Sequence, residues 1–133
     1  MITIQKTITG GNFTVEVLHG TSVGFMNFSW FNIGKMYYFQ TNGLTFTDSV
    51  VGEITFEFPE KFLPRNNVEN KSITILLNGN TTMAFLEYII PDTFKISLSA
   101  IDGLTGAIIN GTDTIMTTGS ITRIYPFDMA FSL

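Results

Sequence analysis

Residues 24–40 read GFMNFSWFNIGKMYYFQ, the densest aromatic stretch of the chain, and they include its only tryptophan, Trp30. The stretch divides at Asn32-Ile33-Gly34-Lys35 into two runs with the aromatic content typical of strands. Period-two alternation assigns side chains to opposite faces of a sheet. One face of the first run has Met26, Phe28 and Trp30 against Asn27, Ser29 and Phe31, and in the second Met36, Tyr38 and Gln40 oppose Tyr37 and Phe39. The stretch predicts an aromatic hairpin at the centre of a sheet core.

The same alternation recurs on both sides of this hairpin. Turn-forming residues, among them Asn42-Gly43 and Asn78-Gly79, separate the alternating segments. The expected strands are 2–8, 12–19, 44–48, 53–58, 72–77, 81–90, 94–99, 120–125 and 127–133. Short strands with frequent turns are typical of sandwiches and jelly rolls. We therefore expect one domain, residues 1–133, folded as an all-β, antiparallel, jelly-roll-like β-sandwich with little or no helix.

The composition suggests that part of the surface is covered in an assembly. Charged residues make up 14% of the 133 residues, aromatic residues another 14%, and the mean hydropathy is +0.28. An ordinary soluble domain has roughly 25% charged residues. Obligate interfaces resemble a domain core cut in half, so we expect a homo-oligomer. A polar, uncharged surface of Thr, Asn and Ser is the alternative.

Charge and residue usage exclude several classes of function. The net charge is −4 and the seven basic residues are scattered, which argues against nucleic acid as a partner. The chain has no cysteine, and this excludes disulfides and thiol chemistry. Residues 1–7 lack the apolar region of a signal peptide and no long apolar run occurs, so neither classical export nor membrane insertion is expected. The five Asn-x-Ser/Thr sequons are attributed to a composition rich in Thr and Asn.

No residue pattern in the sequence indicates a catalytic reaction. His19, the only histidine, precedes Gly20 at a strand end, where a turn role is more typical than catalysis. The carboxylates are spread singly, and Asp102-Gly103 and Asp113 lack the spacing of a calcium loop. We therefore expect a protein that is not an enzyme and that holds no metal or cofactor.

Aromatic side chains are candidates for binding a carbohydrate. Trp30, Tyr37, Tyr38 and Tyr125 are the ones whose faces suit the C–H surface of a sugar. In a chain this rich in aromatics, most of them are expected in a core or an interface. A sugar platform requires two aromatic faces exposed together, and this geometry distinguishes the alternatives.

Three segments together resemble a known family. They are Gly10-Gly11-Asn12-Phe13-Thr14-Val15-Glu16-Val17, then 28–39, and then Ile54-Thr55-Phe56-Glu57-Phe58-Pro59. The pattern is similar to bacteriophage fibre-tip and other virion appendage domains, with a Gly-x-Phe/Trp-Thr strand, a Tyr-x-x-Ile-Gly-x-x-Val-x-Phe segment and a later Ile-Thr-x-x-Leu-Pro strand. The likeness covers roughly residues 10–64, and it departs at Trp30, Phe31 and Phe58.

The resemblance implies a trimeric β-sandwich on a virion surface that decorates the capsid or binds a host glycan. Because the chain begins at Met1 without a stalk, a capsid decoration, cement or minor structural subunit is favoured over a receptor-binding fibre tip. Its partners would be other virion proteins and a host surface glycan, and its location would be the virion. A free carbohydrate-binding module is the rival function, and a small glycoside-acting enzyme is the weakest alternative.

Two residue sets follow from this interpretation. The predicted core consists of Trp30, Phe28, Tyr38, Ile54, Phe56 and Phe58. The predicted contact residues are Arg65, Asn66 and Asn67, in the longest irregular stretch, together with Tyr37 and Tyr125. Long loops on rigid sheets usually have the binding role.

Overall fold

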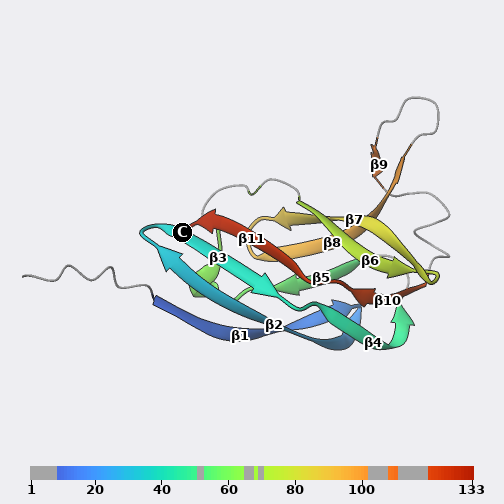
Figure 1. Ribbon diagram of the computed structural model, residues 1–133, viewed down its shortest axis with the longest axis horizontal. Helices are drawn as coiled ribbons and strands as arrows, with labels where there is room; N and C mark the ends of the chain where they lie inside the picture. The colour runs from blue at the N-terminus through green and yellow to red at the C-terminus, as the bar shows by residue number, and fades with distance from the viewer. Residues whose placement is uncertain (1–8, 51–52, 65–67, 69–70, 102–107, 111–119) are drawn as a thin grey trace, which may run out of the picture.

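The structure, a computed structural model, describes residues 9–50, 53–64, 68, 71–101, 108–110 and 120–133 (Figure 1). These residues form antiparallel strands and one 3₁₀ turn, η1 (Glu60–Phe62). The strands are β1 (Thr9–His19), β2 (Thr21–Ile33), β3 (Met36–Thr41), β4 (Leu44–Val50), β5 (Ile54–Glu57), β6 (Lys71–Leu77), β7 (Asn80–Ile89), β8 (Thr93–Ile101), β9 (Ile108–Asn110), β10 (Ile121–Ile124) and β11 (Phe127–Ser132). The all-β, antiparallel prediction is confirmed. The strand expected over residues 2–8 lies outside the described residues.

Hydrogen bonding joins these strands into one curled sheet. Its order is β11-β3-β2-β1-β5-β8-β7-β6-β10-β4, with β9 attached to β8 (Figure 1). A sandwich or jelly roll would divide the strands between two facing sheets. Among the described residues the ladder runs without a break from β11 to β4, so the coarser fold class holds and the division into two sheets is not seen.

A bend of the chain between β3 and β4 connects the two ends of the sheet, because β3 lies next to β11 at one end and β4 is the last strand at the other. β3 pairs with β11, and after the turn at Asn42-Gly43 the chain continues as β4, which pairs with β10. Gly43 makes the turn possible with a φ of +81°, and its N–H donates to the buried hydroxyl of Thr41 at 3.1 Å. A Cβ on Gly43 would overlap the carbonyl oxygen of Ile124, so the backbone at Gly43 is in direct contact with the backbone at Ile124.

Both hairpins predicted from turn residues are present. β2 and β3 meet around Gly34, whose φ is +61°, with Ile33 opposite Met36. β6 and β7 meet at Asn78-Gly79, where both residues have positive φ. The second turn is held by Ser120, whose N–H donates to the Asn78 side-chain oxygen at 2.9 Å.

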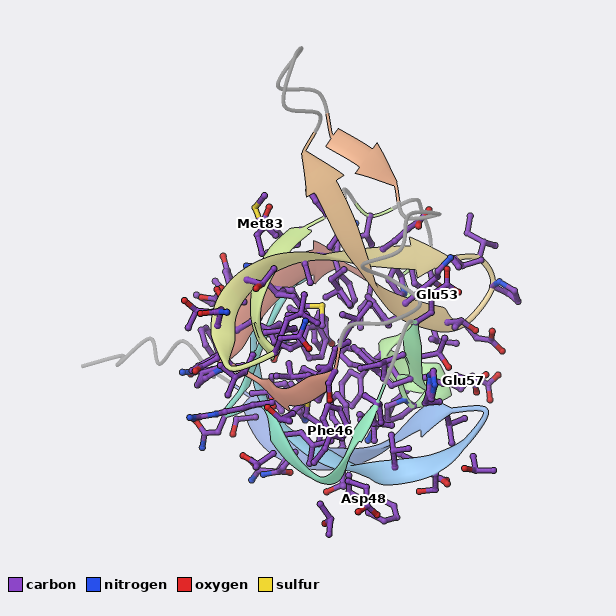
Figure 2. The ribbon with its side chains drawn as sticks, turned by 90° about the vertical axis from the view of Figure 1, so that its right-hand side faces the viewer. Phe46, Asp48, Glu53, Glu57 and Met83 are labelled. Atoms are coloured by element: carbon purple, nitrogen blue, oxygen red, sulfur yellow. The ribbon has the colours of Figure 1, made fainter. Side chains whose placement is uncertain are left out.

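The interior of the curled sheet is rich in aromatic side chains, which make up ten of the 24 buried residues that the structure describes in the hydrophobic core (Figure 2). Phe58, which directly follows β5, is its centre: the ring centroids of Phe13, Phe28, Phe39 and Phe94 lie 4.8–5.0 Å from its own. Along β4, Phe46 points into this interior and Asp48 points away from it, as Figure 2 shows.

The 3₁₀ turn closes one end of this core. Its buried Phe62 packs against Phe13, Trp30 and Tyr37 with centroid distances of 5.1, 4.8 and 6.2 Å. Trp30 and Tyr37 are therefore partly buried beneath η1.

The predicted core is confirmed with one correction. Phe28, Ile54, Phe56 and Phe58 are all buried, and Trp30 packs against them. Tyr38 was wrongly assigned to the core. It lies on the outer face of β3, one position from the inward-pointing Tyr37 and Phe39, because successive residues of a strand point to opposite faces.

Candidate functional site

The outer face of strands β1, β2, β3 and β11 presents an aromatic pair between two very small residues. Gly10, Phe31, Tyr38 and Ala130 lie side by side in the ladder registers. The rings of Phe31 and Tyr38 stack with their centroids 4.9 Å apart and an interplanar angle of 12°. Each ring has one face against the other, and only Gly10 or Ala130 stands next to it on the strand beyond. The stacked rings therefore project above the sheet, with the small residues Gly10 and Ala130 on either side of them.

A polar row runs beside this stack. Asn12, Ser29, Gln40 and Asp128 occupy the next outer position on the same four strands, and all four are exposed. The Ser29 hydroxyl donates to the Asn12 side-chain oxygen at 2.9 Å, which orients both groups. The row provides two amides, a hydroxyl and a carboxylate within reach of a molecule resting on the aromatic stack.

A surface groove of about 390 Å³ lies where the two rows meet on β11. Its outward side chains come from Ser29, Phe31, Tyr38, Gln40, Asp128 and Ala130, and Lys71 at the start of β6 closes one side. This volume is within the range of about 300–1,000 Å³ typical of ligand pockets. These residues are called the β11 groove below.

An ion pair forms one wall of the β11 groove. Lys71 Nζ lies 2.8 Å from Asp128 Oδ1, and the hydrogen bond from the ammonium group lowers the pKa of the Asp128 carboxyl below its usual value. The Asp128 side chain is 81% exposed, so the pair is open to water and to any ligand. The wall therefore offers both donors and acceptors while its charges cancel.

An apolar patch continues from the stack to the tip of the β2–β3 hairpin. Phe31, Ile33 and Met36 point outward, with exposed fractions of 44%, 49% and 39%. Ile33 and Met36 are direct ladder partners, and both lie two residues along their strands from the Phe31–Tyr38 pair. Phe31, Ile33 and Met36 are called the hairpin patch.

The four candidate platform residues, Trp30, Tyr37, Tyr38 and Tyr125, do not lie together on one face. Trp30 and Tyr37 face the interior, whereas Tyr38 faces outward. Tyr125 lies between β10 and β11, six residues before Phe131, which is the ladder partner of Tyr37. The aromatic pair on the outer face is Phe31 and Tyr38, and because their rings stack on each other they do not present two faces side by side.

The five predicted contact residues have different outcomes. Arg65, Asn66 and Asn67 lie outside the described residues, so their role stays a prediction. Tyr37 is half-buried against Trp30 and Phe62. Tyr125 is half-buried too: its ring lies 4.5 Å from the guanidinium of Arg123, and its N–H donates to the Thr74 carbonyl at 3.0 Å. The structure does not bring Tyr37 and Tyr125 into one site.

The groove residues Gln40, Lys71 and Asp128 were missed because they meet only in the tertiary structure. Lys71 and Asp128 are 57 positions apart. One available signal was Phe31, since alternation assigned it, together with Ser29, to the face opposite Trp30.

Two other titratable side chains, His19 and Tyr88, have local structural roles. His19 Nδ1 donates to the Glu53 carbonyl oxygen at 2.7 Å and so ties the end of β1 to the start of β5. Burial and the nearby Asp92 raise the pKa of Tyr88, whose hydroxyl donates to the Pro91 carbonyl. Within the described ranges, no three His, Asp or Glu side chains converge as a metal site would require. The same residues contain no helix long and apolar enough to cross a membrane.

Comparison with known proteins gives no relative from which a role could be transferred. No family model matches the sequence, and neither a curated protein nor a solved structure shows significant similarity to the chain.

Proposed function

We propose that the chain is a non-enzymatic structural or adhesive protein on the surface of a virus particle, and that it attaches through the hairpin patch. The observation that carries the proposal is the group of three neighbouring apolar side chains exposed on a rigid sheet. Contiguous exposed apolar surface commonly marks a site of interaction with another protein.

The patch is large enough to contribute to attachment. Full burial of one such side chain stabilises an association by roughly 1.5–3 kcal/mol, and each of the three is about half exposed. Their complete burial would therefore contribute about 2–4 kcal/mol, a useful share of a moderate affinity.

The low charge content supports self-association as part of this proposal. We propose a homotrimer whose subunits have the character of a virion β-sandwich, in line with the resemblance of residues 10–64 to appendage domains. Capsid decoration, or a cement or minor structural role, ranks above a receptor-binding tip, because a subunit bound to a lattice needs only one docking face.

A free carbohydrate-binding module is the second candidate, and the β11 groove favours it. An exposed ring face next to amide and carboxylate groups suits a sugar better than it suits a flat protein surface. The two candidates separate by location: a particle subunit co-purifies with virions, whereas a free module does not.

Particle association tests the proposal directly. Virions purified from infected cultures of the source would be probed for the protein, and then incubated with recombinant wild type or with the double variant Ile33→Thr, Met36→Thr. Sedimentation should retain the wild type and lose the variant. Met83→Thr is the matched control, since Met83 is 40% exposed and Met36 39% exposed. Absence of the protein from particles, or equal retention of the variant, would refute the proposal.

Two further measurements address the trimer and the predicted contact loop. Light scattering at micromolar concentration should give three times the 14.8 kDa mass of one chain. Replacement of Arg65, Asn66 and Asn67 by alanine should leave folding intact and weaken attachment. A monomer mass would remove the trimer, and unchanged attachment would leave the hairpin patch as the sole contact.

A further inference from the structure

We infer that the β11 groove binds a neutral sugar ring, with Tyr38 as the stacking surface and Gln40, Asp128 and Lys71 as partners for its hydroxyls. This inference rests on the proposed adhesive function and names the class of ligand that the protein would recognise.

The floor of the groove is the first reason. Tyr38 stands in the ladder between Phe31 and Ala130, and stacking on Phe31 holds its ring upright. On the Ala130 side only a methyl group adjoins the ring, so a flat ligand can lie on the alanine and against the aromatic face. The C–H face of a pyranose has this flat, apolar character, and an aromatic ring with a nearby polar group is a suitable partner for it.

The polar rim is the second reason. Gln40 and Asp128 are direct ladder partners, one outer position along the strands from Tyr38 and Ala130. The Gln40 amide both donates and accepts, the carboxylate accepts, and the Lys71 ammonium group donates. Neighbouring hydroxyls around the edge of a sugar ring need such a mixed set. The ion pair uses Asp128 Oδ1, so Oδ2 can accept a hydrogen bond from another donor.

The charge of the groove decides between ligand classes. Lys71 and Asp128 compensate each other at 2.8 Å, and the other groove side chains carry no charge. A charged ligand would be attracted by one of these groups and repelled by the other, so the pair gives an anion or a cation little net attraction. A neutral hexose or N-acetylhexosamine needs none, and each charged group strengthens a hydrogen bond to its hydroxyls.

Binding would be measured by ligand-observed NMR and titration calorimetry with glucose, galactose, mannose and N-acetylglucosamine, each also as a disaccharide. A ligand of about 12 non-hydrogen atoms on an open site is expected to bind in the millimolar range. Tyr38→Ala should lower the affinity about tenfold or more, since it removes a packed aromatic contact. Gln40→Ala should lower it by several-fold through the loss of one hydrogen-bonding group.

Phe25→Ala is the matched control, because Phe25 is an exposed aromatic on the outer face of β2 away from the groove, and this variant should bind as the wild type does. Amide shifts of the wild type on titration give a readout that does not depend on any variant folding, and they should map to β3 and β11.

Three outcomes would overturn the inference: no saturable binding of any probe by the wild type, shifts that map elsewhere, or unchanged affinity of Tyr38→Ala. This experiment does not measure particle retention, so the sugar site and the virion role can be refuted separately. A protein that sediments with virions and binds no sugar would refute the sugar site alone. A protein that binds sugar and is absent from particles would refute the virion role alone.

Discussion

Replacing Gly43 by alanine tests whether the corner between β3 and β4 holds the sheet together. Gly43 and Gly34 both have left-handed φ, +81° and +61°, so alanine at either position incurs a similar conformational cost of roughly 1–2 kcal/mol. At Gly34 a Cβ would meet nothing within 4 Å. At Gly43 it would overlap the Ile124 carbonyl oxygen and lie 2.9 Å from the carbonyl carbons of Ile124 and Tyr125.

The difference between the two variants isolates the steric effect. Forcing backbone apart in a packed region costs about 1–3 kcal/mol, so Gly43→Ala should lower the free energy of unfolding by about 2–5 kcal/mol in total. For a domain of 133 residues, each kcal/mol corresponds to roughly 3–4 °C in Tm. Gly43→Ala should therefore unfold roughly 3–12 °C below Gly34→Ala.

Thermal unfolding followed by far-ultraviolet circular dichroism, with urea titration as a second measure, decides the question. Equal Tm values for the two variants would show that the corner can open without loss, and the account of how β4 and β10 join the sheet would be wrong. A loss at Gly34 as large as that at Gly43 would have the same meaning.

Three other expectations concern the core and the titrating groups. Phe58→Ala should lower the free energy of unfolding by about 3–5 kcal/mol in urea titration, because the ring contacts several buried aromatics, whereas the same change at Phe25, 63% exposed, should cost far less; similar losses would contradict the central role of Phe58. Burial raises the pKa of Tyr88, so the folded state favours the neutral phenol. The contribution of Tyr88 to the free energy of unfolding is therefore present below pH 10 and is lost as the pH rises through the folded-state pKa. Tyr88→Phe should flatten the alkaline fall in Tm. The Lys71 hydrogen bond lowers the pKa of Asp128, so the small contribution of this carboxylate to stability is present above its ordinary pKa of 3.8 and is lost as the pH falls below that value. Asp128→Asn should reduce Tm slightly at pH 7 and leave it unchanged near pH 2. An equal effect on Tm at both pH values would exclude the ion pair as the cause.

The sequence by itself determined the local structure and the two faces of most strands. Alternation in 24–40 correctly separated Phe28 from Phe31, and Asn-Gly and Ile-Gly pairs marked both hairpin turns. These features depend on neighbours in the chain: strand geometry alternates side chains at every step, and positive φ is confined to a few residue types. The same alternation separates Tyr38 from Tyr37, but a strand with aromatics on both faces does not reveal which face is inward.

Only the tertiary structure decided how the strands close and which side chains meet outside. A sandwich and a single curled sheet have the same alternating pattern, and the difference lies at the Gly43 corner, where β4 turns to pair with β10. The β11 groove depends on Lys71 reaching Asp128 across 57 positions and on Ala130 standing next to Tyr38. Such contacts follow from strand order and register, which depend on the packing of the whole core and leave no mark on the residues that happen to meet at the surface.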